Sequence, residues 1–512
     1  MRHRRRIDVP TVSEIEALAE SERLELRVGE AAALQATVAA LVEAAAQAEN
    51  RETIDLRRRT GERDPGYCPS EDEDPLNAFV RRCNVRGATE GTLAGLTVAV
   101  KDNIAIGGVP MTEGSNFPTY VPMLDAVVVE RVLNAGGTIT GTLNMDELGG
   151  GATGVMSAWG AARNPVDPTR TAGGSSGGAG AAVRSGAVDL ALGVDQGGSG
   201  RIPAAFCGVV GIKATHGLVP SHGVGHIDHT LDHVTPLART VDGAARLLEV
   251  VAGDDWRDPQ WVRGPIPNFE RAGIEEAGVD GMRIGMIDES ITTVDCDAAV
   301  LEGFERAAEA LKDNGARVER VSLPIWEHGF AIYMPLVAHL IANMIRTEGV
   351  GSGHLGYIDV DRLHAFAVAR RAESRNLNPY VKAWLLADRH LHDRYLNVSF
   401  GVLQNQRLML RRRLAEKFAE YDLLMTPTVP IVAPKLFADA VPVEDLLAHS
   451  PKSVAHNTAP LNLTGNPAIS IPTDVGRNGS LPTAVQIIAP HFAEREAFRA
   501  AFALESMMGP FD

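Results

Sequence analysis

A glycine-rich segment between Gly149 and Gly223 constrains this chain more than any other feature. The chain has 51 glycines among 512 residues, and the excess is concentrated there. Within it, residues 173–182 read Gly-Gly-Ser-Ser-Gly-Gly-Ala-Gly-Ala-Ala. Glycines on both sides of two serines allow a tight turn with φ > 0 and leave room for a ligand close to the main chain. Because the flanking segments are apolar and strand-like, a site inside a folded domain is favoured over a flexible linker.

This run differs from the two common phosphate-binding patterns. It lacks the GxxxxGK[ST] ending, and it lacks a GxGxxG that opens a helix after a strand with an acid further on. We therefore interpret the two serines, Ser175 and Ser176, as candidates for chemistry or for the hydrogen-bond network around it.

A third serine lies in a second glycine-rich turn. Residues 193–208 read Gly-Val-Asp-Gln-Gly-Gly-Ser-Gly-Arg-Ile-Pro-Ala-Ala-Phe-Cys-Gly. A buried strand is expected over 188–194, and Ser199 stands at the tip of the turn that follows it. Successive N–H groups at such a turn can converge on one point, which is how an oxyanion hole is built. Asp195 and Arg201 are expected to pair and to hold this turn.

Lys101 ends a short apolar strand that is expected over 96–100. A lone lysine is ordinarily a surface cation, so its position at the strand end is what singles it out. A desolvated lysine beside hydroxyl groups has its pKa lowered from about 10.4, so that it can act as a neutral base.

Together these three motifs resemble the amidase signature family. The Gly-Gly-Ser-Ser-Gly-Gly core, the Asp-x-Gly-Gly-Ser-x-Arg-x-Pro-Ala-Ala-Phe-Cys-Gly run and the strand-end Lys-Asp occur in the family's order. The resemblance extends through 144–147, Asn164-Pro165 and 457–467, and thus covers the chain from about residue 76 to its C-terminus.

The resemblance implies a role for each residue that matches a motif. Ser199 matches the nucleophile, Ser175 the bridging serine that follows a cis peptide bond, and Lys101 the general base. The remaining matches are the oxyanion-hole N–H groups of Gln196, Gly197, Gly198 and Ser199, and the substrate-binding positions Gly150, Gly151 and Ser176. The expected reaction is hydrolysis of a small aliphatic or aryl carboxylic amide to acid and amine or ammonia through an acyl-enzyme, with no cofactor and no metal.

Other functions remain open at this level. The same triad serves carbamate, urea, hydrazide and ester hydrolases, and the motifs do not separate these from amidases. Amidotransferase subunits that deliver ammonia to a partner's substrate also resemble this domain, although the helical N-terminal extension favours an enzyme similar to the broad-specificity bacterial amidases. A non-enzymatic binding protein is disfavoured by the intact triad. A panel of amide, anilide, carbamate and ester substrates would discriminate.

Three positions depart from the family pattern. Gly200 stands where Ile or Val usually follows the nucleophile, which predicts a looser or wider pocket floor. Residues 214–216, Ala-Thr-His, replace a common Pro-Thr-Phe/Tyr and predict a polar wall near the site. Thr235 replaces the usual Gly before Pro236. All three bear on substrate preference.

Five histidines lie close together in the sequence: His216, His222, His226, His229 and His233. Their spacing is irregular, they lie among Gly and Pro, and no cysteine or carboxylate pair completes a ligand set. We interpret them as loop or pocket-lining histidines rather than as a metal centre.

The order of elements predicts an α/β fold: a large mixed β-sheet covered by helices, with a small N-terminal helical extension. Strands are expected at 138–142, 284–287, 318–321, 423–425, 468–471 and 484–488, helices at 127–133 and 298–311, and mostly helix over 325–420. Thr11 and Ser13 can cap a first helix, and Ala- and Leu-rich residues 27–49 predict a second. We divide the chain into a helical extension, 1–75, and a catalytic domain, 76–512.

Composition limits partners and compartment. The net charge of −16 argues against nucleic acid or an anionic membrane as a partner. The sequence has no uninterrupted apolar run of 18 residues or more, so we expect no membrane-spanning helix. The four cysteines are widely spaced, which predicts free thiols in a reducing compartment. We expect a cytoplasmic homodimer that acts on a small-molecule amide-type substrate and pairs through the extension's apolar face over 24–41.

Overall fold

The computed structural model describes ten parts of the chain: residues 7–49, 54, 63–117, 120–258, 271–351, 353, 356–437, 442–448, 454–477 and 479–509. It divides the chain into two compact units, Met1–Arg58 and Arg59–Asp512. From the sequence we expected the boundary after residue 75 instead. Residues 63–75 belong to the larger unit, in which Arg63 pairs with Asp125 and Tyr67 bridges to Arg82.

The smaller unit is a pair of helices, α1 (Val12–Ser21) and α2 (Glu30–Glu49). Thr11 caps α1 in a capping box with Glu14, which satisfies two backbone donors at the helix start. Contrary to the expectation from the sequence, two helices in the described part of the chain are long and apolar enough to cross a membrane by length and composition alone. One is α2, in which only Ala31 is buried and an 18-residue window has a mean hydropathy of 1.3. A second segment, Pro324–Arg346, has the same mean hydropathy but is mostly buried inside the protein, as a core helix is.

The larger unit is built on one mixed sheet of eleven strands. Their order across the sheet is β1-β3-β2-β4-β6-β5-β10-β11-β9-β7-β8. The strands are β1 (Phe79–Arg86), β2 (Thr97–Lys101), β3 (Thr138–Leu143), β4 (Leu190–Asp195), β5 (Val210–Lys213), β6 (His233–Ala238), β7 (Arg283–Ile287), β8 (Arg317–Val321), β9 (Leu423–Pro427), β10 (Ala468–Asp474) and β11 (Thr483–Ile488). β2 is parallel to β3 and β4, so all three run in one direction.

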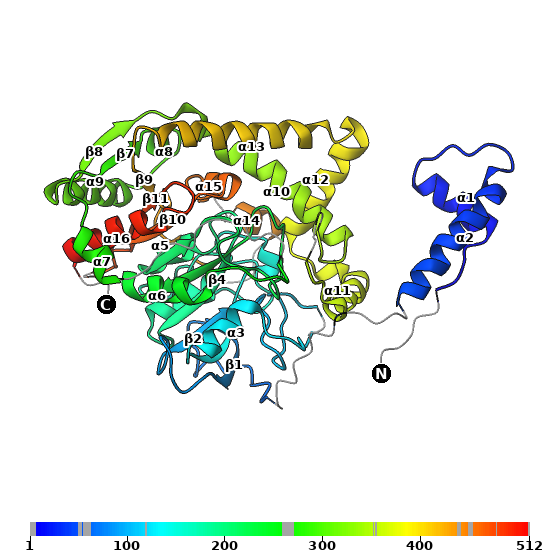
Figure 1. The fold of residues 1–512 in the computed structure, drawn as a ribbon, viewed down its shortest axis with the longest axis horizontal. Helices are drawn as coiled ribbons and strands as arrows, with labels where there is room; N and C mark the ends of the chain where they lie inside the picture. The colour runs from blue at the N-terminus through cyan, green and yellow to red at the C-terminus, as the bar shows by residue number, and fades with distance from the viewer. Residues whose placement is uncertain are drawn as a thin grey trace. The chain divides into compact units, whose positions relative to one another are not determined.

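Helices cover both faces of the sheet because its central strands are buried on both sides (Figure 1). In β2, Val98 and Val100 pack in the cluster that contains α3 (Val127–Asn134), α6 (Val241–Val251), α9 (Ala298–Asp313) and α16 (Glu494–Met508). Ala99 points to the opposite face and packs with α4 (Gly177–Arg184) and α5 (Arg201–Cys207). This alternation follows from the two-residue period of a strand.

A group of long helices lies over one part of the sheet and carries much of the second apolar cluster. These are α10 (Gly329–Arg346), α11 (Val360–Ala372), α12 (Pro379–Tyr395) and α13 (Val398–Lys417). Figure 1 shows α10, α12 and α13 close to one another, with α13 running as one long helix across the top of the view.

The predicted α/β fold with a large mixed sheet is confirmed, and each expected strand is present within a few residues. β7 and β8 also pair in parallel with α9 between them, which makes a βαβ unit. Three strands, β1, β5 and β6, were not predicted from the sequence. β1 carries three arginines, and β6 contains a proline, so neither has the apolar pattern of a sheet strand. β5 has only four residues.

Candidate active site

Lys101 and Ser175 meet in the buried interior. Nζ of Lys101 lies 2.6 Å from Oγ of Ser175 and 3.3 Å from the carbonyl oxygen of Val194. Lys101 is the last residue of β2, and Ser175 lies in the turn before α4. Both side chains are fully buried, and the peptide between Gly174 and Ser175 is cis. Lys101 is therefore a desolvated amine held against one hydroxyl.

Burial is the main reason that Lys101 is a weak cation. It lowers the pKa of Lys101 to about 7, while the negative charges of Asp146, Asp195 and Asp232 act in the opposite direction. A pKa near 7 leaves a large fraction of the amine neutral at neutral pH, so Lys101 can accept a proton.

The two serine turns are joined through the backbone. The N–H of Ser176 donates to the carbonyl oxygen of Ser199 at 3.1 Å, and the N–H of Asp146 donates to the carbonyl oxygen of Ser175 at 3.1 Å. Ser199 follows β4 and comes just before α5. The structure thus brings Lys101, Ser175 and Ser199, which are far apart in the sequence, into one region.

The predicted pairing of Asp195 with Arg201 is confirmed. Their side chains form a fully buried salt bridge of 2.9 Å. The Asp195 carboxylate also accepts from the N–H groups of Gly198, Gly200 and Arg201, so it ties together the turn that carries Ser199. Burial alone would raise the pKa of Asp195, but the Arg201 guanidinium outweighs burial and holds it well below its usual value.

The Asp195 carboxylate limits which amides of the turn can face a substrate. The N–H of Gly198 donates to Oδ1 of Asp195 at 2.8 Å, so this donor is already used. Of the four amides that the resemblance assigned to an oxyanion hole, those of Gln196, Gly197 and Ser199 are the better candidates. Thr458 supports the turn from outside, where its hydroxyl donates to the carbonyl oxygen of Gly197 at 2.7 Å.

A cavity of about 340 Å³ opens beside Ser199. Gly149, Gly151 and Gly197 form its wall next to the serine, and the remaining lining is mostly apolar and aromatic. That lining includes Ile202, Ile227, Phe330, Tyr333, Met334, Val337, Ile341, Tyr380, Trp384 and Leu447. Among the lining residues that the structure describes, no side chain carries a charge. α10 and α12 therefore provide an apolar compartment next to the serine.

Tyr333 brings a polar group close to the Ser199 turn. A Cβ atom added to Gly197 would lie 2.2 Å from the Tyr333 hydroxyl, so the phenol lies directly against this peptide. Burial raises the pKa of Tyr333, and the hydroxyl remains a neutral donor. The absence of a side chain at 197 is what allows this approach.

The expected substrate-binding positions separate in the structure. Gly151 lines the cavity. Gly150 faces Glu147 and Asn378, because a Cβ atom there would lie 3.1 Å from the Glu147 carbonyl oxygen and 3.3 Å from Nδ2 of Asn378. The Ser176 hydroxyl is buried and bonds to both backbone groups of Val194, which indicates a structural role.

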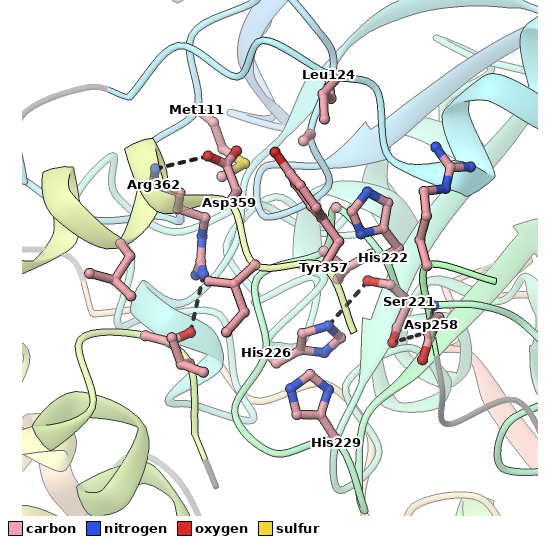
Figure 2. A pocket seen from close by; sticks show the side chains of 18 of the residues that line it. Met111, Leu124, Ser221, His222, His226, His229, Asp258, Tyr357, Asp359 and Arg362 are labelled. Atoms are coloured by element: carbon pink, nitrogen blue, oxygen red, sulfur yellow. Dashed lines mark hydrogen bonds between the residues drawn. The ribbon is translucent and has the colours of Figure 1, made fainter. Parts of the chain in front are cut away.

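Four of the five clustered histidines line pockets, as expected, whereas His233 is a buried residue at the start of β6. Figure 2 shows His222, His226 and His229 around a small cavity with Tyr357, Asp359 and Arg362. Within the described residues, no group of three His, Cys, Asp or Glu side chains is placed to hold a metal. His216 lies instead in a different cavity, and His233 is buried beside Lys213.

Sequence reasoning missed several residues that organise this site. Asp146 accepts from the N–H groups of Gly154 and Met156, and a Cβ atom on Gly174 would lie 2.1 Å from its carboxylate. Burial raises the pKa of Asp146 to about 6. Asn462 donates to Asp195 from a distant helix, and Tyr333 comes from α10. Asp146 belongs to a motif that the resemblance already included, whereas Tyr333 had no local signal.

Comparisons with known proteins agree with one another. A family model described as Amidase matches residues 78–498. The chain is 41% identical over 433 residues to the A subunit of the glutamyl-tRNA(Gln) amidotransferase of Halobacterium salinarum, and the match covers 84% of this chain and 99% of the relative. The crystal structure of the corresponding protein from Thermotoga maritima is 33% identical, with a TM-score of 0.70, and covers 89% of this chain and 96% of that one.

A more distant neighbour is the peptide amidase of Stenotrophomonas maltophilia. It is 24% identical, with a TM-score of 0.67, over 82% of this chain and 85% of that one, and it supports the fold alone.

These relatives overturn the prediction about partners. From the sequence we expected a homodimer that acts on a small-molecule amide, with no nucleic acid and no membrane as partner. The relatives are, by their name, single subunits of an amidotransferase for glutamyl-tRNA(Gln), and so parts of a larger assembly. The prediction was wrong because it inferred partners from net charge and from the helical extension, and neither feature reports on what a domain of this kind assembles with.

Proposed function

This chain belongs to the Amidase family, and we propose that it cleaves a carboxamide C–N bond through an acyl-enzyme on Ser199, as the amide-cleaving component of an amidotransferase. The observation that carries the chemistry is the 2.6 Å contact between Nζ of the buried Lys101 and Oγ of Ser175, next to the turn that holds Ser199. Neutral Lys101 can accept the proton of the Ser175 hydroxyl. Ser175 can then accept the proton of Ser199, which activates Ser199 as a nucleophile.

The proposed reaction begins with attack of Ser199 Oγ on the amide carbonyl carbon. The proton of Ser199 passes to Ser175, and the proton of Ser175 passes to Lys101. A tetrahedral adduct forms with its negative charge on the former carbonyl oxygen. When the C–N bond breaks, the proton returns through Ser175 to the nitrogen, which leaves as ammonia or an amine. Water then attacks the ester on Ser199 and releases the acid.

The tetrahedral oxyanion would be stabilised by the amides of Gln196, Gly197 and Ser199. Fixed backbone donors cost little reorganisation when negative charge develops, which is why such turns accelerate acyl transfer. Asp195 holds the turn from behind through Gly198, Gly200 and Arg201. In this proposal the buried Asp195–Arg201 pair positions the donors and does not contact the substrate.

The similarity to the amidotransferase proteins supports the proposed setting. The chain covers 99% of the Halobacterium salinarum protein, so it contains nearly the whole length of that relative. In an amidotransferase, the ammonia released at Ser199 would pass to an acceptor held by a different component of the assembly. Glutamyl-tRNA(Gln) is the acceptor that the relatives' name indicates.

The apolar lining of the cavity beside Ser199 favours a second candidate function. Free glutamine carries an α-ammonium and an α-carboxylate, and the described residues that line the cavity offer neither group a charged partner. Burial of unpaired charges is costly. Phe330, Met334 and Trp384 would instead accommodate an apolar acyl group, so the second candidate is hydrolysis of an amide with such an acyl group, without transfer of ammonia.

The decisive experiment compares two amides on the purified full chain. Glutamine and hexanamide are assayed for ammonia release, with and without the other subunits of a glutamyl-tRNA(Gln) amidotransferase and its charged tRNA. Glutamine cleavage that increases with these subunits and yields amidated tRNA supports the first candidate. A larger kcat/KM for hexanamide, unaffected by the subunits, supports the second. No ammonia from either amide would contradict both.

A further inference from the structure

Two of the residues that replace the family's usual pattern at 214–216, Thr215 and His216, line a second cavity, which does not include Ser199. This cavity has a volume of about 380 Å³. Thr215 and His216 follow β5, Arg407 and Arg411 come from α13, and Thr464 ends α15 (Ala459–Thr464). From the sequence we expected these residues to form a polar wall beside the active site, but they lie in this separate cavity.

The lining of this cavity is basic in a chain whose net charge is −16. Its described residues include two arginines and two histidines, and no aspartate or glutamate is among them. Arg407 and Arg411 are four residues apart and so lie on one face of α13, where like charges repel. Burial and the neighbouring positive charge of Arg411 lower the pKa of Arg407, while the negative charge of Asp228 acts in the opposite direction.

The two guanidinium groups differ in how they are held. Arg407 donates from Nε to the carbonyl oxygen of Leu463 and from Nη1 and Nη2 to Thr230, which fixes its position and leaves further N–H groups available. Arg411 is exposed and has no hydrogen bond or ion pair with any residue that the structure describes. One cation is therefore preorganised and the other is free to close on a ligand.

A buried hydroxyl adds an independent observation. Thr464 is 3% exposed and lines the cavity, and its Oγ1 has no hydrogen-bond partner within the described part of the chain. Buried hydroxyls are normally satisfied, so such a group indicates a ligand or a solvent molecule that completes it. His491 lies on the same wall, where its Nε2 interacts with the Thr464 carbonyl oxygen.

We propose that this cavity binds a small molecule that carries a phosphate monoester, with the phosphate held by Arg407, Arg411 and the Thr464 hydroxyl. A phosphate monoester has a charge of about −1.5 to −2 at neutral pH, which matches two guanidinium groups, and its oxygens accept several hydrogen bonds. Leu408, Leu463 and Phe492 leave an apolar part of the cavity for the rest of the molecule. This site does not depend on the function proposed for Ser199.

The test measures thermal unfolding of the full chain with phenyl phosphate, against phenol plus sodium chloride at matched ionic strength. A ligand that binds only the folded state raises Tm with its concentration. We expect a saturable rise of Tm with phenyl phosphate, and loss of that rise in Arg411→Gln and in Thr464→Val. Arg412→Gln is the matched control, because Arg412 is 82% exposed on the same helix and pairs with Glu416. This control should keep the full response.

Several outcomes would overturn the proposal. One is the absence of any Tm rise with phenyl phosphate. Another is an equal rise in wild type, Arg411→Gln and Arg412→Gln, which would mean unspecific anion effects. A third is a response to a single-stranded oligonucleotide without a terminal phosphate, but none to phenyl phosphate, which would identify a phosphodiester strand as the ligand. Either variant that loses its fold is recognised by its lowered Tm without ligand, and the other then carries the test.

Discussion

Gly200 and Thr235 share one space next to the nucleophile turn: a Cβ atom built on Gly200 would lie 2.3 Å from Cγ2 of Thr235. Both positions depart from the family pattern, and they do so in opposite directions. The chain has a small residue where Ile or Val is usual and a larger residue where Gly is usual. Thr235 thus fills the volume that a branched side chain at 200 would occupy, and dense packing is preserved.

The first prediction tests this exchange of volume. Gly200→Val should destabilise the protein by about 1–3 kcal/mol, because the new side chain overlaps Thr235. Thr235→Gly in the same chain should recover most of that loss. Urea unfolding of the two single variants and the double variant measures the coupling. Gly401→Val is the control, since nothing lies within 4 Å of a Cβ atom on Gly401. Additive effects in the cycle would show that the two positions are independent.

The second prediction concerns the nucleophile. Ser199→Ala should lose activity by something like the ~10⁶-fold seen when a serine hydrolase loses its nucleophile. A fluorophosphonate probe should label the wild type and not this variant. Ser176→Ala is the control, because the Ser176 hydroxyl bonds to the backbone of β4 and should not be needed for labelling. Labelling of Ser199→Ala at the wild-type level would assign the nucleophile to another residue.

The third prediction is a pH profile. Since Lys101 must be neutral to accept a proton, kcat/KM should rise with pH and level off above the Lys101 pKa of about 7. Asp146 is the largest negative influence on this amine and favours its charged form. Asp146→Asn should therefore move the midpoint to lower pH. A midpoint that moves to higher pH, or a rate that falls as pH rises through 7, is inconsistent with Lys101 as the base.

The fourth prediction addresses the buried ion pair. Arg201→Met leaves the Asp195 carboxylate buried without its cation, which should cost about 3–5 kcal/mol of the free energy of unfolding. Arg412→Met removes an arginine from the exposed pair with Glu416 and should change stability by less than about 1 kcal/mol. Urea titration of both variants gives the comparison. Equal effects would mean that Asp195 and Arg201 do not form the internal support described above.

The sequence alone was enough for the elements that depend on local pattern. β2, β4 and β7 are apolar runs of strand length, and Ala298–Asp313 shows the helical period, so each was predicted close to its observed bounds. Lys101, Ser175 and Ser199 stood out because glycines and a strand end surround them. The pairing of Asp195 with Arg201 was also foreseen, since both flank one turn.

Only the tertiary structure determined which side chains and cavities lie next to the residues of these motifs. Gly200 was expected to widen the pocket floor, but the side chain of Thr235, on the neighbouring strand, fills the space beside it. The polar residues at 215 and 216 were expected near the active site and instead line the basic cavity. The Gly198 amide was counted as an oxyanion donor, but the Asp195 carboxylate already binds it. The apolar cavity wall and the Tyr333 hydroxyl come from α10 and α12, which lie far along the chain from Ser199. The pattern of neighbouring residues determines where a strand, helix or turn forms. Which side chain packs against it from the other side is determined by how distant segments of the chain fold together.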